Sequence, residues 1–281
     1  MTKKKSKINL NGEIFSSKKK IFDANNRAFL YGDALFETIR MFDGELPFLD
    51  LHLQRLRKGL SFFKYKIPKN FNSIFFRKEI KRIAKGNARI RLTVFRSSGG
   101  LYTPQDINPQ FLITTSPLNN SKFHLNKKGL EIGLFNDFQL PCSLVSNLKT
   151  TNSLPYIMAG IFKKEQNLSD CILLNEKGRI AEASSSNIFL FKNDEIITPS
   201  QSEGCISGTL RQTLLDIAKV EKLKVHEIPV TLSALQQAEE VWLTNAIQGI
   251  RWVKTFDNQY FYTNTKAKAL ISKLNLLTKE V

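Results

Sequence analysis

Short apolar runs with a period of two residues recur along this chain and alternate with stretches of helical periodicity. A period of two predicts β-strands, and a period of about 3.6 predicts helices. Asn11-Gly12 and Asp43-Gly44 are dipeptides typical of tight hairpin turns. Because both kinds of element occur in both halves and no internal repeat is present, the pattern predicts an α+β fold.

In the first half, a strand at residues 34–41 runs into Asp43-Gly44, so we expect residues 46–49 to return as its hairpin partner. Asp50 is a suitable N-cap for the next helix, along which Leu53, Leu56 and Leu60 recur at helical spacing. The other elements expected here are a strand and a tight turn within residues 8–14, a helix at 73–84, and strands at 89–96 and 111–115.

Residues 116–126 are polar and turn-prone, which is typical of a connection between domains. The 281 residues also provide enough chain for two domains of about 150 residues. We therefore expect domains at 1–115 and 127–281, joined by this linker. The second should contain a strand at 130–135, hairpins within 171–183 and 187–199, a strand at 240–243, and helices at 156–165, 210–220, 232–238 and 266–277.

Composition limits the classes of function. The net charge is +17, but the lysines are spread along the chain, which indicates a solvated surface and not a nucleic-acid site. Three cysteines and three histidines are too few and too scattered for a disulfide framework or an obvious metal site. No apolar run reaches about 20 residues and no secretory signal is recognisable, so we expect a cytoplasmic protein without a membrane span.

Five features carry possible chemistry, although each has an ordinary structural explanation. Lys149 precedes a helix, Glu182 follows an apolar run, and Arg55 lies on a predicted helix. Two turns, Gly208-Thr209 and Asn245-Ala246, can present backbone N–H groups to an anion. Pyridoxal phosphate needs a lysine to form an imine, an acid beside its pyridine nitrogen and a cradle for its phosphate. The chain supplies a lysine, an acid and candidate phosphate-binding turns. Together they indicate a pyridoxal-phosphate site more strongly than any one of them does alone.

The motifs that contain these residues resemble the class IV aminotransferases, also called the fold-type IV pyridoxal-phosphate enzymes. The resemblance extends over nearly the whole chain, through NRAFLYGDALFETIR, HLQRLR, ARIRLTVFR, LKTTN, AEASSSNIFLF, ISGTLR and VWLTNAIQGI. Several motifs in the right order are stronger evidence than any one. The resemblance implies the two-domain α+β fold of the D-amino-acid aminotransferase type, pyridoxal 5'-phosphate as cofactor, and a homodimer whose sites use both domains and loops of the partner.

The resemblance also implies roles for individual residues. Lys149 holds the cofactor as an imine and acts in catalysis, and Glu182 contacts the pyridine nitrogen. The residues implied at the phosphate are Arg55, Gly208, Thr209, Leu210, Asn245, Ala246 and Ile247, and those implied near the substrate are Phe36 and Arg91. Departures from the family pattern, at Ala183, Leu210 and Arg251-Trp252, spare the lysine and the acid.

Three activities within the resemblance compete. FETIR and ARIRL favour an aminotransferase that moves an amino group between a branched-chain amino acid and a 2-oxo acid. LKTTN, RSSGG and TNAI match 4-amino-4-deoxychorismate lyases, which release 4-aminobenzoate and pyruvate, but Leu101 stands where those often have a basic residue. D-amino-acid aminotransferases rank last, because Leu101 and Thr103 replace their carboxylate-binding pair. A non-enzymatic basic binding protein is the alternative from another class.

Overall fold

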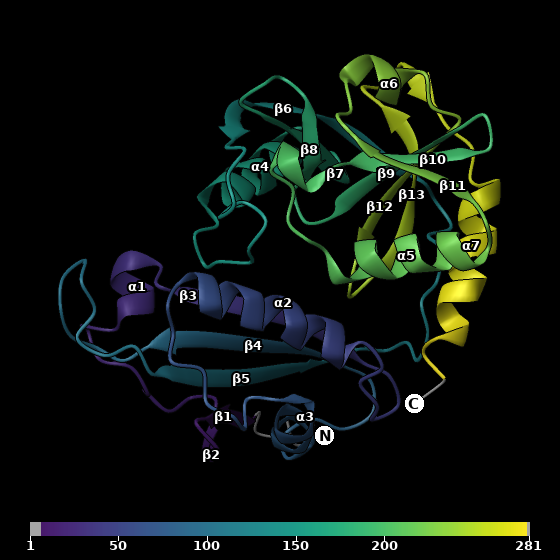
Figure 1. Ribbon diagram of the computed structural model, residues 1–281. Helices are drawn as coiled ribbons and strands as arrows, with labels where there is room; N and C mark the ends of the chain where they lie inside the picture. Colours follow the sequence, from purple (N-terminus) through teal and green to yellow (C-terminus); the bar gives the residue numbers. More distant parts are fainter. Residues whose placement is uncertain (1–6, 280–281) are drawn as a thin grey trace. The chain divides into compact units, whose positions relative to one another are not determined.

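The computed structural model describes residues 7–279, which form two compact units (Figure 1). Of the described residues, unit 1 contains 7–121 together with Leu148–Asn152, and unit 2 contains Lys122–Asn147 and Ser153–Lys279. Each unit is built on one β-sheet with helices, so the predicted α+β class is confirmed. The domain limits at 115 and 127 and the linker between them stay predictions.

Unit 1 has a five-stranded antiparallel sheet with the order β2-β1-β5-β4-β3. The expected turn at Asn11-Gly12 is confirmed, since both residues have positive φ and connect the first two strands. β3 and β4 pair over their whole length, so their alternating residues fall on two distinct faces. The strands are β1 (Lys7–Leu10), β2 (Glu13–Ser16), β3 (Ala34–Met41), β4 (Ala88–Arg96) and β5 (Pro109–Pro117).

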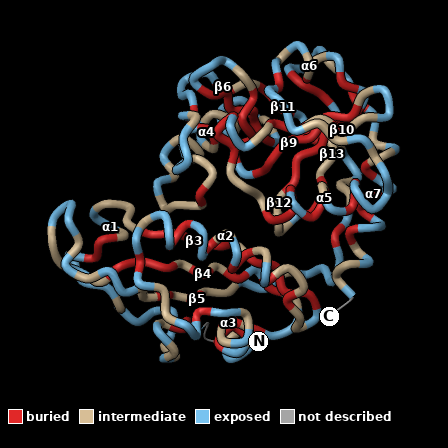
Figure 2. The backbone as a smooth tube through the Cα atoms, viewed as in Figure 1, coloured by how far each residue is buried: buried red, intermediate tan, exposed pale blue. Residues whose placement is uncertain are grey.

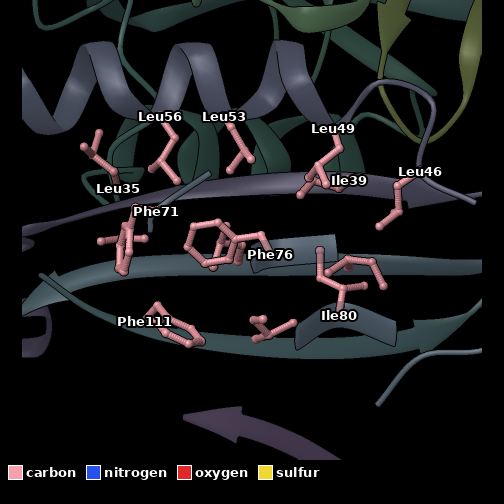
Figure 3. Close-up of a cluster of buried hydrophobic side chains, with 14 of the residues drawn as sticks. Leu35, Ile39, Leu46, Leu49, Leu53, Leu56, Phe71, Phe76, Ile80 and Phe111 are labelled. Atoms are coloured by element: carbon pink, nitrogen blue, oxygen red, sulfur yellow. The ribbon is translucent and has the colours of Figure 1, made fainter. Parts of the chain in front are cut away.

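One face of this sheet is covered by α2 (Leu49–Phe62) and α3 (Ser73–Lys81), and the short α1 (Arg27–Tyr31) precedes β3. The predicted stripe on α2 is buried, with Leu53, Leu56 and Leu60 at most 4% exposed. Figure 3 shows Leu53 and Leu56 directed at the sheet. Each fully buried side chain of this size stabilises the fold by about 1.5–3 kcal/mol, so this layer accounts for much of the unit's stability.

Two predictions in this region are wrong. Residues 46–49 do not return as a strand, because beyond the turn only the single bridge between Phe42 and Glu45 forms. Leu46 is fully buried and Leu49 already begins α2, so their apolar side chains serve the core and not a strand pair. Asp50 lies inside the first turn of α2, where its charge complements the helix dipole, and it is not the N-cap.

Unit 2 contains a larger mixed sheet with the order β11-β10-β9-β12-β13-β6-β7-β8, to which β14 adds beside β13. Residues of β7, β9 and β12 are buried on both faces, which explains their nearly continuous apolar sequences (Figure 2). The predicted hairpins are confirmed as β7–β8 and β9–β10. The strands are β6 (Leu130–Leu140), β7 (Asp170–Asn175), β8 (Ile180–Ala183), β9 (Asn187–Lys192), β10 (Glu195–Pro199), β11 (Lys224–Ile228), β12 (Glu240–Asn245), β13 (Gly249–Phe256) and β14 (Tyr260–Phe261).

The helices of unit 2 are α4 (Leu154–Glu165), the 3-10 helix η1 (Gln201–Glu203), α5 (Thr209–Val220), α6 (Leu232–Gln236) and α7 (Thr265–Leu276). The sequence predicted all four α-helices of unit 2 within a few residues of these bounds. It did not predict α1 in unit 1 or the strands β11, β13 and β14 in unit 2. β11 is a polar edge strand and β13 is interrupted by charged residues, so neither shows a clean alternation. No helix among residues 7–279 has the length and apolar character needed to cross a membrane.

Candidate active site

Lys149 lies in a short segment of unit 1 that continues the sheet beyond β3. The Phe36 N–H donates to the Lys149 carbonyl at 2.9 Å, and Leu35 forms a bridge with Thr150. The Thr151 N–H donates to the Ala34 carbonyl at 3.1 Å. These backbone bonds fix the position of residue 149 without using its side chain.

A glycine in front of β3 makes room for this segment. Gly32 has a φ of 62° and ends α1 in the left-handed conformation. A Cβ at Gly32 would lie 2.2 Å from Asn152 Oδ1, so a larger residue would displace the Asn152 side chain and would also be strained at this positive φ.

The ring of Phe36 joins the two unit 1 residues that were assigned to chemistry. Lys149 Nζ lies 4.7 Å from the ring centroid and Arg91 Cζ lies 3.8 Å from it. Both distances permit a cation–π interaction. Unit 1 therefore brings the three predicted residues Lys149, Phe36 and Arg91 together.

Arg55 is held by a buried acid on β3. Arg55 Nε donates to Glu37 Oε1 at 2.8 Å, its Nη2 donates to Oε2, and His52 Nδ1 lies 2.6 Å from Oε2. Burial opposes ionisation of Glu37, but the charges and hydrogen bonds of Arg55 and His52 lower its pKa to about 2. Burial is the largest cause of the lowered pKa of His52, and the bond to Glu37 opposes it. Glu37 is thus ionised at neutral pH and orients the arginine predicted for phosphate binding.

Glu182 is the centre of the corresponding group in unit 2. It lies on β8 and is only 3% exposed, contrary to the solvent-facing position that is usual for a strand glutamate. Tyr156 Oη donates to Oε1 at 2.5 Å, while Asn187 Nδ2 and the Ile206 N–H both donate to Oε2 at 3.2 Å. Three donors favour the ionised carboxylate. Tyr156 cannot easily ionise there, because burial and the nearby Glu182 charge raise its pKa.

The start of α5 has the form of an anion-binding site. Gly208 is the N-cap and offers no side chain to the first turn. The first N–H groups of a helix have no partners within it, and the helix dipole adds positive potential. A Cβ at Gly208 would lie 1.9 Å from Asn187 Oδ1, which makes glycine necessary here. Thr209 and Leu210 follow it, both buried.

The turn after β12 is shaped by Asn245. Its Oδ1 accepts hydrogen bonds from the Ile247 N–H at 3.1 Å and the Gln248 N–H at 2.8 Å, and its Nδ2 donates to Ser186 Oγ at 3.0 Å. The Ile247 N–H is therefore engaged by a side chain, whereas Ala246 donates to no protein acceptor in the described part of the chain. Of this turn, Ala246 is the residue best able to offer its N–H to a ligand.

Sequence reasoning missed four residues of these two groups: Glu37, His52, Tyr156 and Asn187. Each acts by a contact with a residue far from it along the chain, except Asn187, which lies five residues after Glu182 on the next strand in the sequence. The run SSSN carried the one available signal, since an asparagine at the start of a buried strand needs a polar partner.

Comparisons with known proteins agree on one family. Residues 34–256 match the family described as Amino-transferase class IV. A Methanocaldococcus jannaschii protein that carries an assignment as branched-chain-amino-acid aminotransferase is 27% identical, over 98% of this chain and 96% of the relative. The aminodeoxychorismate lyase of Bacillus subtilis is 28% identical, over 85% of this chain and 83% of the relative.

Among solved structures, the branched-chain amino acid aminotransferase of Escherichia coli has the same fold. Its TM-score is 0.87 at 21% identity, over 99% of this chain and 96% of that one. The family match covers most of the chain and agrees with the motifs that carried the resemblance. This chain therefore belongs to the class IV aminotransferases, the family of pyridoxal-phosphate enzymes.

Proposed function

We propose that the protein is a pyridoxal-phosphate-dependent aminotransferase that moves an amino group between an amino acid, of the branched-chain type, and a 2-oxo acid. The observation that carries the proposal is Glu182, a buried carboxylate that accepts three hydrogen bonds in the unit that also contains the α5 start. A carboxylate that is oriented by three hydrogen bonds suits a protonated ring nitrogen of a ligand.

The residues present suit the cofactor. The charge of Glu182 complements a protonated pyridine nitrogen, and the first N–H groups and the dipole of α5 complement a phosphate. Ala246 would add a further N–H, and Arg55, oriented by Glu37, a positive charge. Leu210 would contribute its backbone N–H and not its side chain, and Asn245 and Ile247 would shape the second turn.

Pyridoxal phosphate supplies an aldehyde that reacts with amines and a ring that withdraws electrons from the substrate's Cα. Lys149 Nζ would hold the cofactor covalently and, once displaced, take the Cα proton as general base. Its backbone bonds to β3 hold the residue that carries this amine. Glu182 would keep the ring nitrogen protonated, and Tyr156 and Asn187 would keep Glu182 ionised and oriented.

The substrate proposal is tested by offering L-leucine, D-alanine and 4-amino-4-deoxychorismate separately to the purified enzyme with 2-oxoglutarate. We expect L-leucine to give 4-methyl-2-oxopentanoate and glutamate, and D-alanine to react far more slowly. Absence of L-leucine transamination by a cofactor-loaded protein would contradict the proposal.

A lyase is the second candidate, because a relative of 28% identity is an aminodeoxychorismate lyase. Both activities require the same lysine, acid and phosphate cradle, so the shared residues do not separate them. Pyruvate and 4-aminobenzoate formed from 4-amino-4-deoxychorismate, without any transamination of L-leucine, would establish the lyase in place of the aminotransferase.

We further propose that the enzyme acts as a homodimer in which α4 takes part in the interface. Leu154, Ile157, Met158 and Ile161 lie at helical spacing along α4, and each is at least 45% exposed. A contiguous exposed apolar stripe of this kind marks a protein–protein contact. Two copies of the same chain can bury such a stripe against each other or against a neighbouring loop.

Replacing both Ile157 and Ile161 by aspartate is expected to convert the dimer to a monomer in sedimentation velocity at micromolar concentration. Two charges would have to be buried in the interface, which costs several kcal/mol. Ile74→Asp is the matched control, because Ile74 is 81% exposed on α3, outside the stripe. A double variant that sediments as a dimer would remove α4 from the interface.

A further inference from the structure

The chain between η1 and α5 forms no helix or strand at residues 204–208, called here the entry segment. Its backbone groups therefore need partners outside a regular element. Asn147, also in unit 2, bonds repeatedly to this part of the chain. Its Nδ2 donates to the Gln201 carbonyl and to the Cys205 carbonyl, both at 2.8 Å, and its own carbonyl accepts from the Ser207 N–H at 3.1 Å.

The first peptide group of interest joins Cys205 to Ile206. Its carbonyl oxygen belongs to Cys205 and its N–H to Ile206, and the two point in opposite directions because the group is planar and trans. Asn147 Nδ2 binds the carbonyl, while the N–H donates to Glu182 Oε2 at 3.2 Å. Because the planar group turns as one unit, the bond to Asn147 also sets the direction of the N–H toward Glu182.

The second peptide group, between Ile206 and Ser207, is also held on both sides. Asn187 Nδ2 donates to the Ile206 carbonyl at 2.8 Å, and the Ser207 N–H donates to the Asn147 carbonyl. Gly208 follows directly as the N-cap of α5. The direction in which the chain enters α5 therefore depends on a peptide group that Asn147 helps to fix.

We propose that Asn147 is a positioning residue of the cofactor site, which directs the Ile206 N–H at Glu182 and fixes the entry of the chain into α5. The proposal rests on the proposed function, because it assumes that Glu182 and the α5 start hold the cofactor. Asn147 acts through the entry segment and not by a contact with the ligand. Without its bonds the segment can adopt other conformations, and the apparent affinity falls with the fraction of molecules that stay competent to bind.

The test measures binding of pyridoxamine 5'-phosphate to the full-length protein, freed of its cofactor, by titration calorimetry. This probe has the ring and the phosphate but cannot form an imine with a lysine, so its affinity reports the non-covalent contacts. In Asn147→Ala the dissociation constant should rise about tenfold, because the ligand has to make up for one or two lost hydrogen bonds. Asn147→Asp keeps the size of the side chain but loses both N–H donors, so it should show a similar rise.

Asn126→Ala is the matched control. Asn126 is also half-buried in unit 2, and its Nδ2 likewise donates to two backbone carbonyls, of Lys128 at 2.7 Å and Trp252 at 2.9 Å. These bonds hold neither Glu182 nor the entry segment. The control should lose a similar amount of stability in urea unfolding, while its dissociation constant for the probe changes by less than about twofold.

Hydrogen exchange gives a second measurement that does not depend on a variant. In wild type, the probe should slow exchange within the entry segment, because the ligand and Asn147 favour the same conformation. Exchange there that is unchanged by the probe, under conditions where the probe is bound, would overturn the role of the segment and of Asn147.

The remaining outcomes separate this proposal from the proposed function. An unchanged dissociation constant in Asn147→Ala, an equal rise in Asn126→Ala, or wild-type affinity in Asn147→Asp would each overturn the role of Asn147. If wild type binds the probe but does not transaminate L-leucine, the aminotransferase proposal fails, and a weaker Asn147→Ala still supports the positioning role. A wild type that does not bind the probe would overturn both.

Discussion

Lys149→Ala is expected to lower turnover by about a thousandfold or more and to remove the visible absorbance of the covalently held cofactor. The proposed base contributes about 10²–10⁴-fold by proton transfer alone, and the covalent attachment is lost with it. The fold should be unaffected, because residue 149 contacts β3 through its backbone carbonyl, which accepts from the Phe36 N–H at 2.9 Å.

The measurement combines steady-state transamination, the absorption spectrum and the thermal unfolding midpoint of one preparation. Lys58→Ala is a suitable control, since it removes an exposed lysine from α2 in the same unit. It should leave rate and spectrum unchanged. If Lys149→Ala kept its rate within tenfold of wild type, another amine would have to hold the cofactor.

Glu182→Gln is expected to lower kcat about a hundredfold or more, because it replaces a charge opposite the protonated ring nitrogen by a neutral amide. Losing one preorganised electrostatic group costs about 10²–10³ in rate. The amide also has one acceptor oxygen for the three donors that Glu182 satisfies, Tyr156, Asn187 and Ile206. An unsatisfied buried donor costs about 1–3 kcal/mol, so the unfolding midpoint should fall as well.

Glu240→Gln separates the loss of kcat caused by the missing charge at residue 182 from the loss of kcat caused by lower stability. Glu240 is also buried in unit 2, is 2% exposed, and accepts from three donors, Trp242 Nε1, the Lys266 N–H and the Ala267 N–H. It should lose stability to a similar extent while keeping the cofactor spectrum and kcat near wild type. Equal losses of kcat in both variants would mean that the loss in Glu182→Gln reflects general destabilisation.

The predictions that succeeded rest on local patterns. The stripe of Leu53, Leu56 and Leu60 predicted a helix because side chains at that spacing share one face, and the structure buries all three. Asn11-Gly12 predicted a hairpin because few other dipeptides adopt positive φ at both positions. The predicted strand at residues 46–49 was wrong because its local pattern fits two structures. An apolar run after a turn fits either a returning strand or a helix start, and only the space between α2 and the sheet decides between them.

The sequence by itself determined the order of most elements, the α+β class, and the family, through motifs that surround Lys149 and Glu182. Only the tertiary structure decided that Glu182 is buried with three donors and that Glu37 holds Arg55. The physical reason is that burial and hydrogen bonding depend on residues brought together from distant parts of the chain. The type of a residue and its neighbours in sequence indicate which reactions it can take part in. They do not indicate which residues it contacts in the folded protein.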